Sequence, residues 1–153
     1  MQALLWGLFA TLPMLAGMLL VDRLRFRPFV RLRRFFRHIV LPLFQDASLI
    51  ELALISLIAG IGEELLFRGL MQDGLATWLG GTHGLWVGLT ASSLVFGLAH
   101  AVTRTYAVLA ALAGLYLGGL FLLTDNLLAP VTTHAVYNFL TLAYLVARRR
   151  GQP

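Results

Sequence analysis

The sequence predicts an all-α protein, a polytopic transmembrane helical bundle of about five spans with an arginine-rich interfacial segment. Hydrophobic residues fill 59% of the 153 positions and charged residues only 12%, whereas a soluble domain carries about 25% charged residues. The apolar residues form long stretches that, as helices, can cross a hydrocarbon core of about 30 Å. Arginines gather beside these stretches, as is typical of the cytoplasmic side of membrane proteins. This composition is incompatible with a soluble globular domain.

The first predicted span covers Ala3 to Val21, with Pro13 as an expected kink. It has no basic start and no small-residue cleavage site, so it does not resemble a signal peptide. Seven of the twelve arginines follow between Arg23 and Arg37. The segment from Arg23 to His38 is either an amphipathic helix in the headgroup layer, although Pro28 interrupts it, or a cytoplasmic loop. Residues 1–46 form a first unit with this span and segment, and residues 47–153 a helical core.

The core is expected to begin at a helix capped by Asp46 or Ser48. Its expected helices run over Leu49–Leu79, Leu85–Ala101, Tyr106–Thr124 and Leu127–Ala147. Five spans with the N-terminus outside and the C-terminus in the cytoplasm place every arginine cluster inside. Basic runs beside membrane spans do not indicate nucleic-acid binding, and the lipid bilayer is the expected partner instead.

Two smaller features restrict the chemistry. Gly114 and Gly118 have the small-xxx-small spacing that lets helices approach closely in lipid, so we assign them to packing. The chain has no cysteine, which excludes disulfides, thiolate catalysis and thiolate metal sites.

Three polar motifs lie on separate predicted helices: Glu63-Glu64-x-x-x-Arg68, Phe96-x-x-x-His100 and His134-x-x-x-Asn138. Ionisable residues within membrane segments indicate a functional site by default. Residues four apart share one helix face, so each motif presents its side chains together. His38 and His83 lie in or beside predicted loops and are interpreted as structural.

The two glutamates are expected to have different roles. An unpaired Arg68 in lipid is costly, so an ion pair with Glu64, four residues earlier, is the economical arrangement. Glu63 points about 100° away round the helix, and burial makes such a carboxylate a better base. On straight spans Glu63 and His100 differ by roughly 15 Å in depth. A shared site therefore requires tilt, or a kink at Gly60 or Gly62.

These residue types suggest two kinds of hydrolysis. Glu63 and His100 can activate a water molecule that attacks a peptide carbonyl, while His134 and Asn138 donate hydrogen bonds to the oxyanion. Alternatively, two histidines and a carboxylate can hold zinc, but the zincin motif His-Glu-x-x-His is absent. The first mechanism needs no cofactor.

The ordered set of three motifs resembles the CPBP family of intramembrane proteases, which includes CAAX prenyl endopeptidases and bacterial Abi proteins. The resemblance covers roughly Leu49 to Ala147. It implies a glutamate-dependent endopeptidase with Glu63, His100, His134 and Asn138 as catalytic residues. Glu64 and Arg68 become supporting residues and Phe96 a packing residue.

The expected substrate is a membrane-associated protein or peptide, and the expected location is a bacterial inner membrane. Prenylated substrates, sorting tails and bacteriocin or phage-defence roles all stay open. Two other functions also remain: a non-enzymatic immunity or scaffold protein of the same fold, and a small transporter. The absence of an evident internal repeat disfavours the transporter.

Overall fold

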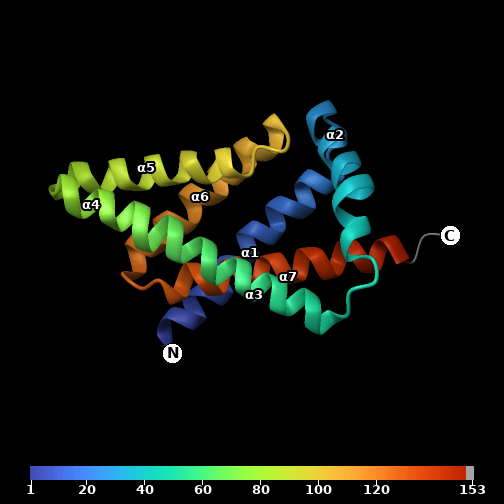
Figure 1. The fold of residues 1–153 in the computed structure, drawn as a ribbon, viewed down its shortest axis with the longest axis horizontal. Coiled ribbons are helices and arrows are strands. Elements are labelled where there is room, and N and C mark those ends of the chain that lie inside the picture. The colour runs from blue at the N-terminus through green and yellow to red at the C-terminus, as the bar shows by residue number, and fades with distance from the viewer. Residues whose placement is uncertain (151–153) are drawn as a thin grey trace.

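The computed structural model describes residues 1–150, and helices account for nearly all of that range (Figure 1). The α-helices are α1 (Gln2–Arg23), α2 (Arg27–Phe35), α3 (Leu49–Glu64), α4 (Asp73–Leu79), α5 (Gly81–Ala99), α6 (Arg104–Thr124) and α7 (Leu128–Arg150). Two π-helical segments, η1 (Phe36–Val40) and η3 (Leu65–Gln72), and a 3₁₀ turn, η2 (Leu41–Phe44), join some of them. The prediction of an all-α fold is confirmed.

The long helix predicted from Leu49 to Leu79 is continuous through α3, η3 and α4. Ser48 begins it with a capping box: its Oγ accepts from the Glu51 backbone, and the Glu51 carboxylate accepts from the Ser48 backbone at 2.7 Å. The glycines do not break the helix. The helix instead changes from α-helical to π-helical geometry at η3. Short π-helical segments are often found at functional sites.

α4 and α5 form a tight antiparallel hairpin around Gly80, whose φ of +68° favours glycine. A Cβ added at Gly84 would lie 2.5 Å from the Ala76 carbonyl oxygen, and one at Gly88 would overlap the Gln72 carbonyl oxygen. The two helices therefore touch backbone to backbone. This contact fixes the register in which η3 continues along α5.

Replacing Gly88 with alanine is expected to destabilise the protein by about 1–3 kcal/mol, because the added methyl group must push a backbone carbonyl aside. Gly74→Ala, on α4 with open space around its Cα, is the matched control and should be neutral or slightly stabilising. Thermal unfolding in detergent measures both. Equal stability of the two variants would contradict the close packing of the hairpin.

The predicted packing role of Gly114 and Gly118 is confirmed. A Cβ at Gly114 would lie 3.0 Å from Ser93 Cα, and one at Gly118 would lie 2.5 Å from Leu89 Cδ1. These glycines bring α6 against α5 and expose their carbonyls to side chains of η3, since Arg68 Nη2 donates to Gly114 O at 3.0 Å and Gln72 Nε2 donates to Gly118 O at 3.0 Å.

α7 packs against both α1 and α3, and the two arginine groups meet at its C-terminal end. Arg148 pairs with Asp22 at 2.5 Å, and Arg149 donates to the Arg37 carbonyl at 2.8 Å. The segment between α1 and α3 is helical, and Pro28 lies in the first turn of α2 rather than interrupting it. The helical conformation expected in the first alternative is therefore present from Arg27 to Phe44, whereas its position in the headgroup layer stays a prediction. Figure 1 shows α2 and η1 beside this end of the molecule.

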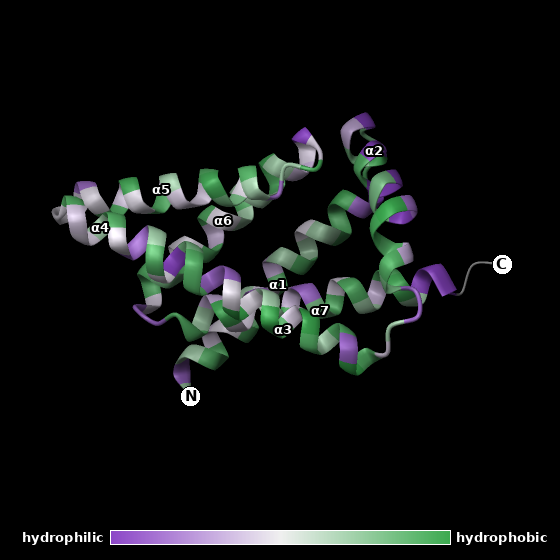
Figure 2. Cartoon of the chain, in the orientation of Figure 1, coloured by the Kyte–Doolittle hydropathy of each residue, from purple (hydrophilic) through white to green (hydrophobic). Residues whose placement is uncertain are grey.

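The exterior of the bundle is apolar, and much of its buried interior is polar. Figure 2 shows green, hydrophobic residues along the outer helices. The side chains that are at least 98% buried include Glu64, Arg68 and Gln72. Three helices, α1, α5 and α6, are long and apolar enough to cross a membrane. α3 and α7 do not meet that combined standard, so the count of about five spans is not confirmed.

Candidate active site

The two adjacent glutamates at the end of α3 face different surroundings. Glu64 is completely buried, whereas the Glu63 side chain keeps 31% of its surface exposed. Successive helical residues point about 100° apart, so one carboxylate faces the protein interior while the other faces an adjoining cavity. The structure thus separates the two side chains as their spacing predicts.

Glu64 is the centre of a buried polar network. Its Oε1 accepts from Arg68 Nη1 at 3.0 Å, which confirms the predicted ion pair. The same oxygen lies 2.7 Å from His134 Nδ1. A carboxylate can only accept, so His134 carries a proton on Nδ1 and donates it to Glu64. His134 was predicted to belong to the site, but its bond to Glu64 was not predicted.

Glu63 lies opposite two histidines that are oriented in the same way. Its Oε2 is 3.5 Å from His100 Nε2 and 3.9 Å from His134 Nε2. His100 Nδ1 is also engaged, because it lies 2.8 Å from the Phe96 carbonyl and donates to it. Both imidazoles therefore use Nδ1 for anchoring and direct Nε2 towards Glu63.

These three groups line a cavity that can hold a water molecule beside them. Separations of 3.5 and 3.9 Å are long for direct hydrogen bonds, and a water in the cavity can contact two of the groups at once. Glu63 Oε2 is buried and has no hydrogen-bond partner within the described residues. An unsatisfied carboxylate oxygen next to two free imidazole nitrogens is arranged to receive a proton.

The predicted 15 Å difference in depth between Glu63 and His100 is wrong. That estimate placed each residue within an independently assigned span. Counted from the shared turn, Glu63 lies 17 residues before Gly80 and His100 lies 20 residues after it. Three residues correspond to about 4.5 Å of helix rise, so the α4–α5 hairpin brings the two side chains together without a break at Gly60 or Gly62.

Phe96 packs at the centre of the site, as expected of a packing residue. Its ring lies 4.9 Å from the Phe67 ring and 4.4 Å from the His100 ring, centroid to centroid. The Arg68 guanidinium lies over it at 4.8 Å. This ring therefore braces both a motif histidine and the buried arginine.

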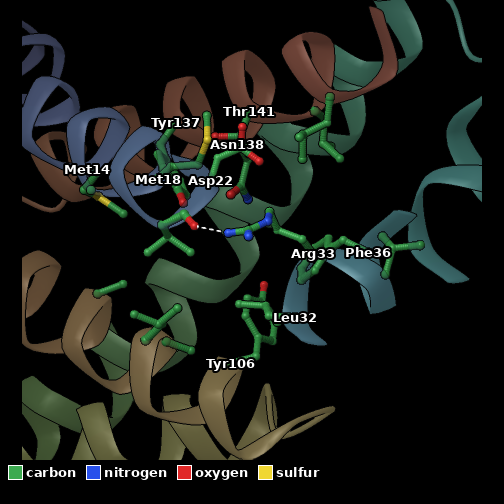
Figure 3. A pocket seen from close by; sticks show the side chains of 18 of the residues that line it. Met14, Met18, Asp22, Leu32, Arg33, Phe36, Tyr106, Tyr137, Asn138 and Thr141 are labelled. Atoms are coloured by element: carbon green, nitrogen blue, oxygen red, sulfur yellow. Dashed lines mark hydrogen bonds between the residues drawn. The ribbon is translucent and has the colours of Figure 1, made fainter. Parts of the chain in front are cut away.

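Asn138 lies one turn beyond His134 on α7 and lines the same cavity as Glu63, His100 and His134. The cavity has a volume of about 1020 Å³ and reaches from this cluster to α1, α2 and η1. Figure 3 shows Asn138 directed into it. All four residues predicted to be catalytic thus line one cavity.

Several residues of the site were not anticipated. Tyr106 and Tyr137 line the cavity, and the Tyr106 ring lies 5.9 Å from that of His100. Gln72 is buried and extends the spacing of Glu64 and Arg68 by four more residues, a signal that was readable from the sequence. Among the described residues, no group of three or more His, Asp or Glu side chains is arranged to hold a metal.

Comparisons with known proteins identify the family. Neither the curated proteins nor the solved structures gave a match. The family model described as type II CAAX prenyl endopeptidase Rce1-like matches residues 45–140, which include all three polar motifs. The match covers more than half of the chain and supports the resemblance drawn from those motifs. With the apolar helices, it makes this an integral membrane protein. The chain belongs to the Rce1-like family of type II CAAX prenyl endopeptidases.

Proposed function

We propose that the protein is a glutamic intramembrane endopeptidase that hydrolyses a peptide bond of a membrane-associated protein or peptide. The observation that carries this proposal is the position of Glu63, whose unpartnered Oε2 faces the Nε2 atoms of His100 and His134 beside a large cavity. The family match supports a protease with membrane-associated substrates.

In the proposed mechanism, a water molecule held between Glu63 and His100 gives a proton to Glu63 as its oxygen attacks the scissile carbonyl. The Asn138 amide donates to the developing oxyanion. His134 can donate from Nε2 only as an imidazolium, because Nδ1–H is already given to Glu64, and the Glu64 carboxylate stabilises that cation. The proton on Glu63 then passes to the leaving amine, which completes the hydrolysis without a cofactor.

The proposed membrane arrangement has five spans, with residues 1–46 as an accessory unit and residues 47–153 as the catalytic core. The continuous helix 49–79 and the 23-residue α7 are long enough to cross the bilayer beside α1, α5 and α6. The meeting of Asp22, Arg37 and the terminal arginines at one end supports a shared cytoplasmic side. We propose a bacterial inner membrane with the N-terminus outside.

The alternatives gain less support. In a non-enzymatic scaffold or immunity protein, polar side chains serve to hold helices together, as Glu64 does through its bond to His134 of α7. Glu63 instead lines the cavity together with His100, His134 and Asn138. A zinc protease requires a set of metal ligands, and no such group is found among the described residues.

The deciding experiment uses purified protein in proteoliposomes with a panel of membrane-tethered peptides, including prenylated CAAX peptides, with and without a chelator. Cleavage is expected to survive the chelator unchanged, because the proposed base and oxyanion donors are all side chains. If the chelator abolishes cleavage and added zinc restores it, the mechanism is zinc-dependent. Absence of cleavage across the panel, with folded protein, would favour the scaffold.

A further inference from the structure

The cavity beside Glu63 is largely apolar, but its lining includes several arginines from α2, η1 and the C-terminal end of α7. Its walls include Met14 and Met18 of α1 (Figure 3). Two carboxylates, Asp22 and Glu63, line it together with five arginines: Arg33, Arg34, Arg37, Arg148 and Arg149. Asp22 is already paired with Arg148. An occupant that complements this lining is apolar with an anionic end.

Arg33 differs from the other arginines of α2 and η1. Arg27, Arg31, Arg34 and Arg37 are exposed, whereas Arg33 is partly buried. Its Nη1 donates to the carbonyls of Val21 at 2.5 Å and Leu24 at 2.9 Å, at the C-terminal end of α1. These bonds hold the guanidinium inward, and Figure 3 shows it pointing into the cavity, as Tyr106 and Asn138 do.

No carboxylate in the described residues pairs with Arg33. A guanidinium has five N–H donors in a fixed fork that matches a carboxylate bidentately. With Nη1 occupied by backbone carbonyls, the remaining donors can still bind an anion. A lipid phosphate binds more readily to the exposed arginines, because their side chains are free to extend into the headgroup layer.

Arg33 and Glu63 line the same cavity, and a chain of aromatic contacts runs between their surroundings. Phe36, one turn along the same helix, packs its ring 5.2 Å from that of Tyr106, and Tyr106 lies 5.9 Å from His100. An extended peptide tail of three or four residues spans about 10–14 Å. Such a tail can run from a scissile bond at Glu63 towards α2.

We propose that Arg33 determines specificity by binding the free C-terminal carboxylate of the peptide substrate. This proposal rests on the proposed function, because it assumes that the scissile bond lies at Glu63. Arg33 sets which peptides bind productively and takes no part in bond cleavage.

The test measures binding rather than cleavage, so that it is independent of turnover. A fluorescent farnesylated CAAX peptide is prepared with a free C-terminal carboxylate and as the C-terminal amide. Anisotropy titrations use the Glu63→Gln protein in nanodiscs of neutral lipid and of lipid with an anionic fraction. The free acid is expected to bind about tenfold or more tightly than the amide, as a charge-assisted hydrogen bond predicts.

Adding Arg33→Gln should abolish this preference by weakening the acid alone, and Arg33→Lys should retain part of it. Arg31→Gln, an exposed arginine of the same helix outside the cavity lining, should leave it intact. Equal binding of acid and amide by the parent protein, or no binding of either, overturns the proposal. An Arg33→Gln substitution that weakens binding of both peptides equally also overturns it, because that result indicates a structural role. The proposal fails as well if the effect of Arg33→Gln appears only in nanodiscs with anionic lipid, because that result indicates headgroup binding. Acid preference without cleavage by the unsubstituted protein would overturn the proposed function alone.

Discussion

Replacing Glu63 with glutamine is expected to lower the rate of peptide cleavage by about 10²–10⁴-fold, the contribution of a general base. Glutamine has nearly the same volume but cannot take the proton from the attacking water. Glu63 Oε2 has no hydrogen-bond partner within the described residues, and the side chain is partly exposed. The substitution should therefore leave the unfolding temperature nearly unchanged and act on the rate constant for cleavage.

The matched control is Asp73→Asn, which removes an exposed carboxylate further along the same continuous helix. It should cleave at the unsubstituted rate. Near-normal cleavage by Glu63→Gln would show that Glu63 is not the base. An equal loss of cleavage in Glu63→Gln and Asp73→Asn would indicate a general effect of charge.

Replacing Arg68 with methionine is expected to destabilise the protein by about 3–5 kcal/mol, because it leaves the carboxylate of the fully buried Glu64 without its cation. Arg68 also donates to the Gly114 carbonyl and stacks on Phe96. Its loss therefore affects η3, α5 and α6 at once. Chemical or thermal unfolding in detergent, monitored by circular dichroism, gives the change in stability.

Adding Glu64→Gln to Arg68→Met should recover part of that stability, since a neutral pair carries no uncompensated charge. Activity should stay low in the double variant, because His134 has lost the carboxylate that stabilises its charge. Arg148→Met is the control: its pair with Asp22 is half exposed on the arginine side and should contribute no more than about 1 kcal/mol. A double variant as unstable as Arg68→Met alone would contradict the pairing.

Much of the fold was predictable from the sequence, because helix boundaries depend on local signals. The Ser48 cap, the glycine turn at Gly80 and the apolar stretches located the helices to within a few residues. The number of membrane spans was less determinate. The π-helical segment η3 follows α3 and leaves it with only 16 residues, and the polar residues of α7 lower its mean hydropathy.

The candidate site was predictable in its membership but not in its connections. Spacing four residues apart led directly to the Glu64–Arg68 pair. The bond from His134 to Glu64 joins residues 70 positions apart, and only the packing of α7 on α3 creates it. The error in the depth of His100 was avoidable, since counting from the shared turn at Gly80 requires no structure. Arg33 gave no separate signal within a run of similar arginines.

The role of Glu63 is tested most directly by a single-turnover reaction in H₂¹⁸O, with mass spectrometry of both the peptide product and the protein fragment that contains Glu63. Attack by an activated water predicts one ¹⁸O in the new carboxylate of the product and none in Glu63. Label in the Glu63 carboxylate would show that this side chain attacks the substrate itself, and would contradict its assignment as the base.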